Sequence, residues 1–103
     1  MSLFEVIAEP NRRRILDLLG PGELPVSDLV EGLGLSQPAV SKHLRVLREA
    51  GLVDRRGDGA RRLYRVQPEP LQEAVAWLEP YRQMWTSRLS DLEHHLDDMP
   101  DTD

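Results

Sequence analysis

The chain has 103 residues, 40% of them hydrophobic, and a formal net charge of −5. This length fits one domain with a modest core. The sequence contains no cysteine, which excludes disulfides, thiolate metal sites and a thiol nucleophile. No apolar run is long enough to span a membrane and no signal-peptide pattern follows Met1, so we expect a cytoplasmic protein with no membrane partner.

The negative net charge conceals an uneven distribution. Residues 36–65 contain eight Lys or Arg against three acids, whereas residues 67–103 contain two Arg against nine acids. The field close to the phosphates matters more for DNA binding than the total charge does. The basic stretch is therefore compatible with nucleic-acid binding, and the acidic tail would lie away from a duplex or discourage non-specific binding.

Two helices are predicted before residue 20. Residues 3–9 form a short apolar-rich segment with Ser2 as its cap, and Pro10 breaks it. We expect Asn11 to cap a second helix that ends near Leu19. The triplet 12–14, all arginine, opens this helix although the helix dipole prefers acids there. Both phosphate contact and a solvated face are consistent with the triplet.

A helix-turn-helix is predicted next. After the Gly20–Gly22 turn, residues 24–26 suit a short edge strand, and Ser27 is expected to cap a helix over 28–33. Gly34 would end that helix, and the next helix would begin at Ser36. Two short helices joined by a glycine turn of this length are typical of a helix-turn-helix.

The stretch 36–51 has the pattern of a helix with one apolar face, packed inward, and polar residues on its other faces. Ser36 can cap its first turn, Pro38 is tolerated there, and Gly51 suits the left-handed residue that ends a helix. An apolar stripe at 4,3 spacing consists of Val40, Leu44 and Leu47. The other faces present Gln37, Ser41, Lys42, Arg45 and Arg48. A helix with this division of faces suits the major groove.

A β-hairpin is predicted after Gly51. Residues 52–56 suit a strand, 57–60 a tight turn with two glycines able to take positive φ, and 61–66 a returning strand. Its five arginines are Arg55, Arg56, Arg61, Arg62 and Arg65.

The remaining chain has the pattern of a long helix after a connector at 67–70. From Trp85 the apolar spacing is 4,3,4, which is close to a heptad seam. Pro80 predicts a kink or a short break near 77–80. We expect the acidic residues 99–103 to be frayed.

These residues resemble a known family. Residues 35–53 resemble the helix-turn-helix of ArsR-family winged-helix repressors, and 9–19 are similar to the helix that opens that domain. The resemblance implies a mainly α fold with a small β-hairpin wing, and a homodimer formed through the first and last helices. Residues 1–66 would be the DNA-binding part and 67–103 a dimerisation helix of the same domain. The family's usual mechanism is occupation of promoter DNA.

The predicted DNA interface combines the helix over 36–50 with the hairpin. Gln37 can pair with adenine, and Arg45 or Lys42 with guanine or a phosphate. His43 lies near the apolar stripe, so packing and DNA contact are equally consistent with it. The candidate DNA-binding residues are Ser36, Gln37, Ser41, Lys42, His43, Arg45, Arg55, Arg56, Arg61 and Arg62.

A dimer is expected because the last helix has more apolar surface than so small a domain covers alone. A twofold dimer would place two recognition helices about one DNA turn apart on an inverted repeat. The alternative is a helix that folds back on its own core. The candidate interface residues are Leu3, Phe4, Ile7, Leu78, Trp85, Leu89, Leu92 and Leu96.

No metal or cofactor is expected. At one family metal site the chain has Pro25 and Ser27 in place of cysteines, and at the other Tyr81 and Gln83 replace the upstream half. A solvated acidic face is therefore the preferred interpretation of four weak candidate ligands, Asp91, His94, His95 and Asp98. The tail is similar to a metal-independent subgroup that includes autorepressors. Trp77, Tyr81 and Trp85 would form either core or a small-molecule pocket.

The predicted function is a DNA-binding transcriptional regulator, and no enzyme is expected. The chain has no Gly-rich phosphate loop, no nucleophile with a base at motif spacing and no identifiable carboxylate pair. The alternatives are a winged-helix protein-interaction module without DNA binding, and the same repressor gated by zinc or a small molecule. The operator and the effector are not predicted.

Overall fold

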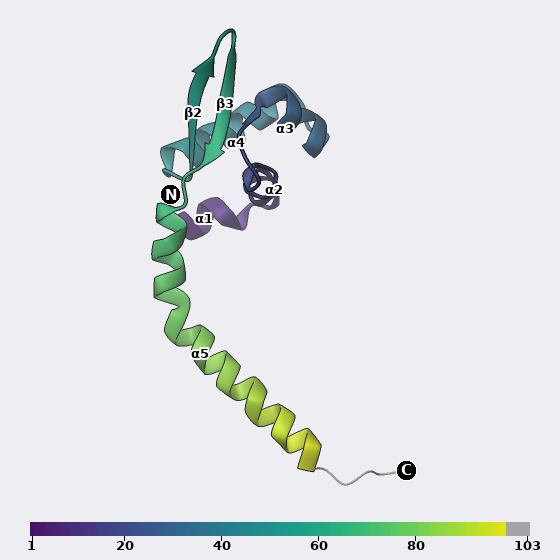
Figure 1. Cartoon of the computed structure of the whole chain (residues 1–103), viewed down its shortest axis with the longest axis vertical. Helices are drawn as coiled ribbons and strands as arrows, with labels where there is room; N and C mark the ends of the chain where they lie inside the picture. The colour runs from purple at the N-terminus through teal and green to yellow at the C-terminus, as the bar shows by residue number, and fades with distance from the viewer. Residues whose placement is uncertain (99–103) are drawn as a thin grey trace. The chain divides into compact units, whose positions relative to one another are not determined.

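The computed structural model describes residues 1–98, with side chains described as far as Leu96. The described elements are α1 (Leu3–Ala8), α2 (Pro10–Leu19), β1 (Leu24–Pro25), α3 (Val26–Leu33), α4 (Gln37–Glu49), β2 (Val53–Asp58), β3 (Arg61–Val66) and α5 (Glu69–Asp98). They belong to two units, Met1–Gln72 and Glu73–Asp103 (Figure 1). The predicted class, mainly α with a small β-hairpin, is confirmed. No helix among the described residues has the length and apolarity that crossing a membrane needs.

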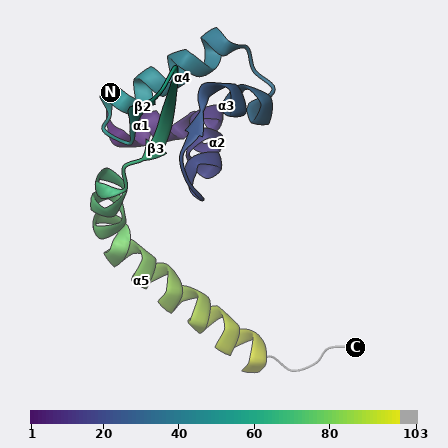
Figure 2. The same ribbon diagram turned by 45° about the horizontal axis from the view of Figure 1, so that its top comes forward.

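The first unit encloses a core to which every element from α1 to β3 contributes. In Figures 1 and 2, α4 lies beside α3 and beside the hairpin of β2 and β3. Three residues of α4 form the predicted inward stripe, and they are 0%, 1% and 0% exposed: Val40, Leu44 and Leu47. The stripe packs with Ile15 and Leu19 of α2 and with Leu29 of α3 in the same core cluster. This packing fixes which face of α4 remains outside.

The caps of α1 and α4 are as predicted, and those of α2 and α3 differ from the prediction. Ser2 Oγ accepts a hydrogen bond from the Glu5 amide at 3.1 Å. The expected cap at Asn11 is wrong, because α2 begins at Pro10 and the Glu9 carboxylate accepts from the Arg12 amide at 2.9 Å. Proline suits the first helical position because its missing N–H needs no partner there, so the helix begins two residues earlier than a cap at Asn11 would place it.

The start of α3 is the second difference. Ser27 was expected to cap this helix but lies inside it, since α3 begins at Val26 with Pro25 at the cap position. Pro25 has extended backbone angles, φ −76° and ψ 162°, and no side-chain cap bond is formed. Because Pro25 also belongs to β1, the chain passes directly from strand to helix. Gly34, at φ +68°, ends α3 as predicted.

The sheet has the strand order β1-β3-β2, and both pairings are antiparallel. The expected four-residue turn at 57–60 is wrong, because Gly57 and Asp58 continue β2 and pair with Arg62 and Arg61. Only a two-residue turn remains, in which Gly59 has φ +63°. Positive φ at the first central position alone is the pattern of a type II′ turn, whose twist matches that of the flanking strands.

Helix α5 continues through Pro80 without interruption, so the predicted short break is wrong. The ribbon bends part-way along its length in Figure 1, in keeping with the expected kink. Its apolar side chains are largely exposed within the chain, including Trp85 at 61% and Leu89 at 58%. Trp77 and Tyr81 contact each other with ring centroids 5.2 Å apart. The predicted fraying at 99–103 lies outside the described residues.

Candidate nucleic-acid interface

The outer face of α4 presents polar side chains because the inner face is fixed by the core. Ser36, Gln37, Ser41, Lys42 and Arg45 are all exposed. Ser36 Oγ accepts from the Ala39 amide at 3.3 Å, so its hydroxyl already caps the helix. The structure thus brings five of the predicted helix residues together on one accessible surface.

Two cations of this face differ in their partners. Arg45 Nε lies 3.1 Å from Glu49 Oε1, and the two side chains are 78% and 66% exposed. An exposed ion pair one helical turn apart is weak, so a phosphate or a base edge can replace Glu49. Lys42 makes no hydrogen bond or ion pair within the described part of the chain. Both cations are therefore available to a polyanion.

His43 lies apart from the other candidates. Its side chain is 21% exposed, and Nδ1 lies 3.9 Å from Glu9 Oε2. The same Glu9 oxygen accepts from the Arg12 amide and caps α2. His43 therefore points toward the start of α2, which matches the packing alternative that its position in the sequence left open.

Two arginines of the triplet at the start of α2 donate hydrogen bonds to the protein's own backbone. Arg13 donates to the carbonyls of Ile7 and Ala8, both at 2.8 Å, and so satisfies the end of α1. Arg14 donates to the Leu33 carbonyl at 3.4 Å, at the end of α3. Cations at helix C-termini complement the unpaired carbonyls and the dipole. This accounts for two of the three arginines without invoking phosphate.

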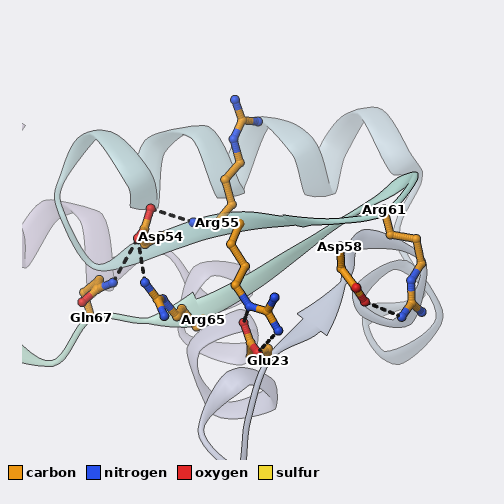
Figure 3. A network of polar contacts seen from close by, with 8 residues as sticks. Glu23, Asp54, Arg55, Asp58, Arg61, Arg65 and Gln67 are labelled. Atoms are coloured by element: carbon orange, nitrogen blue, oxygen red, sulfur yellow. Dashed lines mark hydrogen bonds and ion pairs between the residues drawn. The ribbon is translucent and has the colours of Figure 1, made fainter.

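In the hairpin, Arg56 is bound to an acid from a distant part of the chain. Its Nε and Nη2 donate to the two carboxylate oxygens of Glu23 at 2.7 and 2.8 Å (Figure 3). The two parallel hydrogen bonds lower the pKa of Glu23 below its ordinary value and raise the pKa of Arg56. Glu23 directly precedes β1, so the ion pair links β1 to β2.

A second acid, Asp54, gathers three donors at the base of the hairpin. It accepts from the Arg55 amide at 2.8 Å, from Arg65 Nη2 at 3.3 Å and from Gln67 Nε2 at 3.4 Å (Figure 3). These bonds, the backbone one above all, lower the pKa of Asp54 below its ordinary value. At the tip, Arg61 Nη2 contacts Asp58 Oδ2 at 3.2 Å, with both side chains about half exposed or more.

Two hairpin arginines have no such partner. Neither the Arg55 nor the Arg62 side chain makes a hydrogen bond or an ion pair with any of the side chains that the structure describes, those of residues 1–96. Figure 3 shows the Arg55 guanidinium extending away from the side of the hairpin on which Glu23 lies. Five arginines that look alike in the sequence therefore differ in how much of their charge is neutralised.

The acids that bind the hairpin arginines, and the acid that caps α2, were not identified from the sequence. Glu23 lies 33 positions from Arg56, and no local pattern links the two. The role of Asp54 was weakly indicated by its position, because an acid beside an arginine-rich strand can accept a hydrogen bond from the amide of the next residue. The capping role of Glu9 was indicated more clearly, since Glu9 directly precedes the proline that begins a helix.

The weak metal candidates do not converge in the region the structure describes. No group of three or more His, Cys, Asp or Glu residues there could hold a metal ion. Asp91, His94 and His95 lie on α5, and the side chain of Asp98 lies outside the described region.

Comparisons with known proteins identify the regulators that this chain resembles. A family model described as "Bacterial regulatory protein, arsR family" matches residues 9–55. The transcriptional repressor SdpR of Bacillus subtilis is 32% identical over 77 residues, which cover 75% of this chain and 86% of the relative. The regulator Rv2034 of Mycobacterium tuberculosis is 38% identical over 87 residues, covering 84% of this chain and 78% of the relative. A crystal structure of a possible transcriptional regulator for arsenical resistance has a TM-score of 0.70 and 39% identity, and covers 98% of this chain and 99% of its own.

Proposed function

The chain belongs to the ArsR family of bacterial regulatory proteins and is a DNA-binding transcriptional regulator; we propose that it is a dimeric repressor that occupies an inverted repeat in promoter DNA. In this proposal α4 enters the major groove and the hairpin lies along the flanking backbone as a wing. The observation behind it is the exposed polar face of α4, held outward by a stripe that is at most 1% exposed. This is the geometry that groove recognition requires.

We assign recognition to α4 and backbone contact to the wing. Gln37 and Ser41 are uncharged and exposed near the start of α4, where side chains reach base edges. Lys42 and Arg45 would contact guanine or phosphate, and Ser36 would add a phosphate contact beside its capping role. His43 is the weakest member because Glu9 lies beside it. The sequence predicts four wing residues for DNA contact, Arg55, Arg56, Arg61 and Arg62, and of these four only Arg56 forms a two-bond contact with an acid.

The exposed apolar surface supports the proposed dimer. Five α5 residues are between 44% and 61% exposed: Leu78, Trp85, Leu89, Leu92 and Leu96. Phe4 of α1 is 46% exposed. Apolar surface on this scale is typical of a protein interface, and a second copy presents the complementary seam. With Leu3 and Ile7 of α1, these residues would form the interface. Residues 1–66 would then bind DNA and 67–103 dimerise within one domain.

Regulation without metal is the second part of the proposal. The chain has no cysteine, and no three His, Asp or Glu side chains converge among those described for residues 1–96. An open apolar hollow of about 370 Å³ on α5, lined in part by Leu78, Tyr81 and Trp85, suits a partner helix as well as a small molecule. Adding zinc should leave DNA affinity unchanged. A zinc-dependent change in affinity would support the metal-gated alternative instead.

Selection from random duplexes is the experiment that tests the function. The enriched sequences should contain an inverted repeat with half-sites about one helical turn apart. Fluorescence anisotropy against a scrambled duplex of equal length then measures the preference, and a transcription assay with the site inside a promoter measures repression. Failure to enrich any sequence would contradict the proposal and favour a protein-interaction module. Enrichment of a single half-site would contradict the dimer.

A further inference from the structure

The hairpin arginines divide into positioning and contact residues. Resting on the DNA-binding proposal above, we propose that Glu23 is a positioning residue of the wing. It binds Arg56 and sets the hairpin against β1, so that the backbone contacts come from Arg55 and Arg62. Arg56, which the sequence suggests as a DNA contact, would then act through the protein rather than through a phosphate.

The first argument is the geometry of the Glu23–Arg56 pair. Two parallel N–H···O bonds of 2.7 and 2.8 Å hold the guanidinium in one plane and one orientation. The side chains are 32% and 49% exposed, so the pair is more enclosed than the Arg45–Glu49 pair of α4. A phosphate that engaged Arg56 would have to replace both bonds and leave Glu23 beside the phosphate.

The second argument is the place of the pair in the sheet. Pro25 of β1 pairs with Leu63 of β3, and Leu63 pairs with Arg56 of β2. Glu23 therefore reaches from the edge strand β1 across the level of β3 to the opposite edge strand. The pair ties together the two outer strands of a sheet whose β1 has only two residues. Such a tie restricts the angle at which the hairpin leaves the body of the unit.

The third argument is the contrast with the neighbouring arginines. Arg55 and Arg62 have no hydrogen-bond or ion-pair partner among the described side chains of residues 1–96, so none of those contacts has to break when they meet a phosphate. Arg61 has one bond to Asp58 at the exposed tip, and Arg65 has one to Asp54 at the base. A single exposed bond is easily exchanged, whereas the two-bond fork of Arg56 is not.

The test is the salt dependence of binding to the selected duplex for full-length variants. Each phosphate contact contributes about 0.9 to the slope of log affinity against log salt concentration. Because the proposed dimer carries each residue twice, we expect Arg55→Ala and Arg62→Ala each to flatten the slope by about 1.8. We expect Glu23→Gln and Arg56→Ala each to weaken binding roughly three- to tenfold with the slope unchanged, and the double variant to bind no more weakly than either single.

Two further variants separate positioning from charge. Arg56→Lys keeps the cation but loses the two-bond fork, so it should bind like Arg56→Ala. Glu31 is an exposed acid of α3 without a hydrogen-bond or ion-pair partner in the described region, and Glu31→Gln removes the same charge as Glu23→Gln. It should not weaken binding. Thermal unfolding of each variant ensures that affinity is compared below the start of unfolding.

The opposite outcome has a clear signature. If Arg56 contacts phosphate, Glu23→Gln frees it, and binding becomes tighter with a steeper slope, while Arg56→Ala flattens the slope. Either result would overturn the positioning role. If the wild-type protein showed no preference for any duplex, the failure would be that of the proposed function rather than of this assignment.

Discussion

The two units of the chain treat their apolar residues in opposite ways. In Met1–Gln72 the inward stripe of α4, Val40, Leu44 and Leu47, is at most 1% exposed, whereas in the second unit the large apolar side chains of α5 are mostly above 40% exposed. Burial of apolar surface is the main favourable term in folding and association. The first unit obtains it within the chain, and we expect the second to obtain it from a partner. This contrast predicts which substitutions affect folding and which affect assembly.

The largest expected effect is on assembly. Leu89→Glu combined with Leu92→Glu places two charges on side chains that are 58% and 52% exposed in the single chain. If these residues form the dimer seam, the variant should be monomeric by sedimentation at micromolar concentration. Its affinity for an inverted repeat should fall roughly 10²- to 10⁴-fold, because the two half-sites are no longer linked.

A matched control lies on the same helix. Ser87→Glu with Ser90→Glu adds the same charge at positions that fall off the seam by helical spacing. That variant should remain dimeric and bind normally. If the double leucine variant also remained dimeric, the apolar face of α5 would need an explanation other than a second copy.

The next largest effect is on the stability of the first unit. Leu44 is 1% exposed and belongs to the core cluster, so Leu44→Ala should lower the free energy of unfolding by about 2–5 kcal/mol. Leu96→Ala removes the same atoms from a side chain that is 58% exposed. Its effect in urea unfolding should be smaller and should depend on protein concentration. If both variants lost the same free energy of unfolding, independently of protein concentration, the two units would not differ in how they bury apolar surface.

Substitutions at helix starts should have smaller effects on the stability of the first unit than the core substitution. Ser36→Ala removes the acceptor of the Ala39 amide and should destabilise the protein by about 1 kcal/mol. Ser27→Ala, inside α3, should be neutral or slightly stabilising, because no cap bond is lost and Ala favours the helix. Thermal unfolding of the two variants measures the difference. A loss at Ser27 as large as at Ser36 would mean that Ser27 has a capping role after all.

Local signals explain why α4 was predictable. The Ser36 cap, the 4,3 spacing of the stripe and the left-handed glycine at 51 all lie within one stretch, and each acts over one helical turn. Where two local signals competed, the sequence was ambiguous. Glu9 and Asn11 both flank Pro10, and only the structure shows that the glutamate accepts the bond. The turn at 57–60 depended on strand register, which the glycines alone do not determine.

The polar contacts of the hairpin could not be predicted in the same way. Pairing of Glu23 with Arg56 depends on β1 joining the sheet beside β3, which is a property of the whole unit. The sequence therefore identified a basic hairpin but treated its arginines as equivalent. A polar contact in α5 is predictable by contrast, because Glu79 and Arg82 are three residues apart and helical spacing alone brings them together.

The smallest expected effect distinguishes these two Arg–Glu pairs by pH. Arg82 lowers the pKa of Glu79 through the same kind of two-bond contact with which Arg56 lowers that of Glu23. A depressed pKa means that each contact stabilises the folded state above the ordinary carboxyl pKa of 4.5, and that this contribution is lost as pH falls through the lowered value. Carboxyl NMR titration should give midpoints for Glu23 and Glu79 below the ordinary glutamate value of 4.5.

The substitutions that remove each contact should then act separately. Arg56→Ala should return only Glu23 toward the ordinary midpoint, and Arg82→Ala only Glu79. The two contacts differ in what else disturbs them. Glu23 needs the assembled sheet, so Leu44→Ala, near its unfolding transition, should raise the Glu23 midpoint as β1 separates from the hairpin. The contact between Arg82 and Glu79 requires only one folded turn of α5. The Glu79 midpoint should therefore rise only when α5 itself loses its helical structure. Parallel shifts of both carboxyls in that variant would mean that α5 loses its structure together with the first unit, and that the two units are not independent in stability.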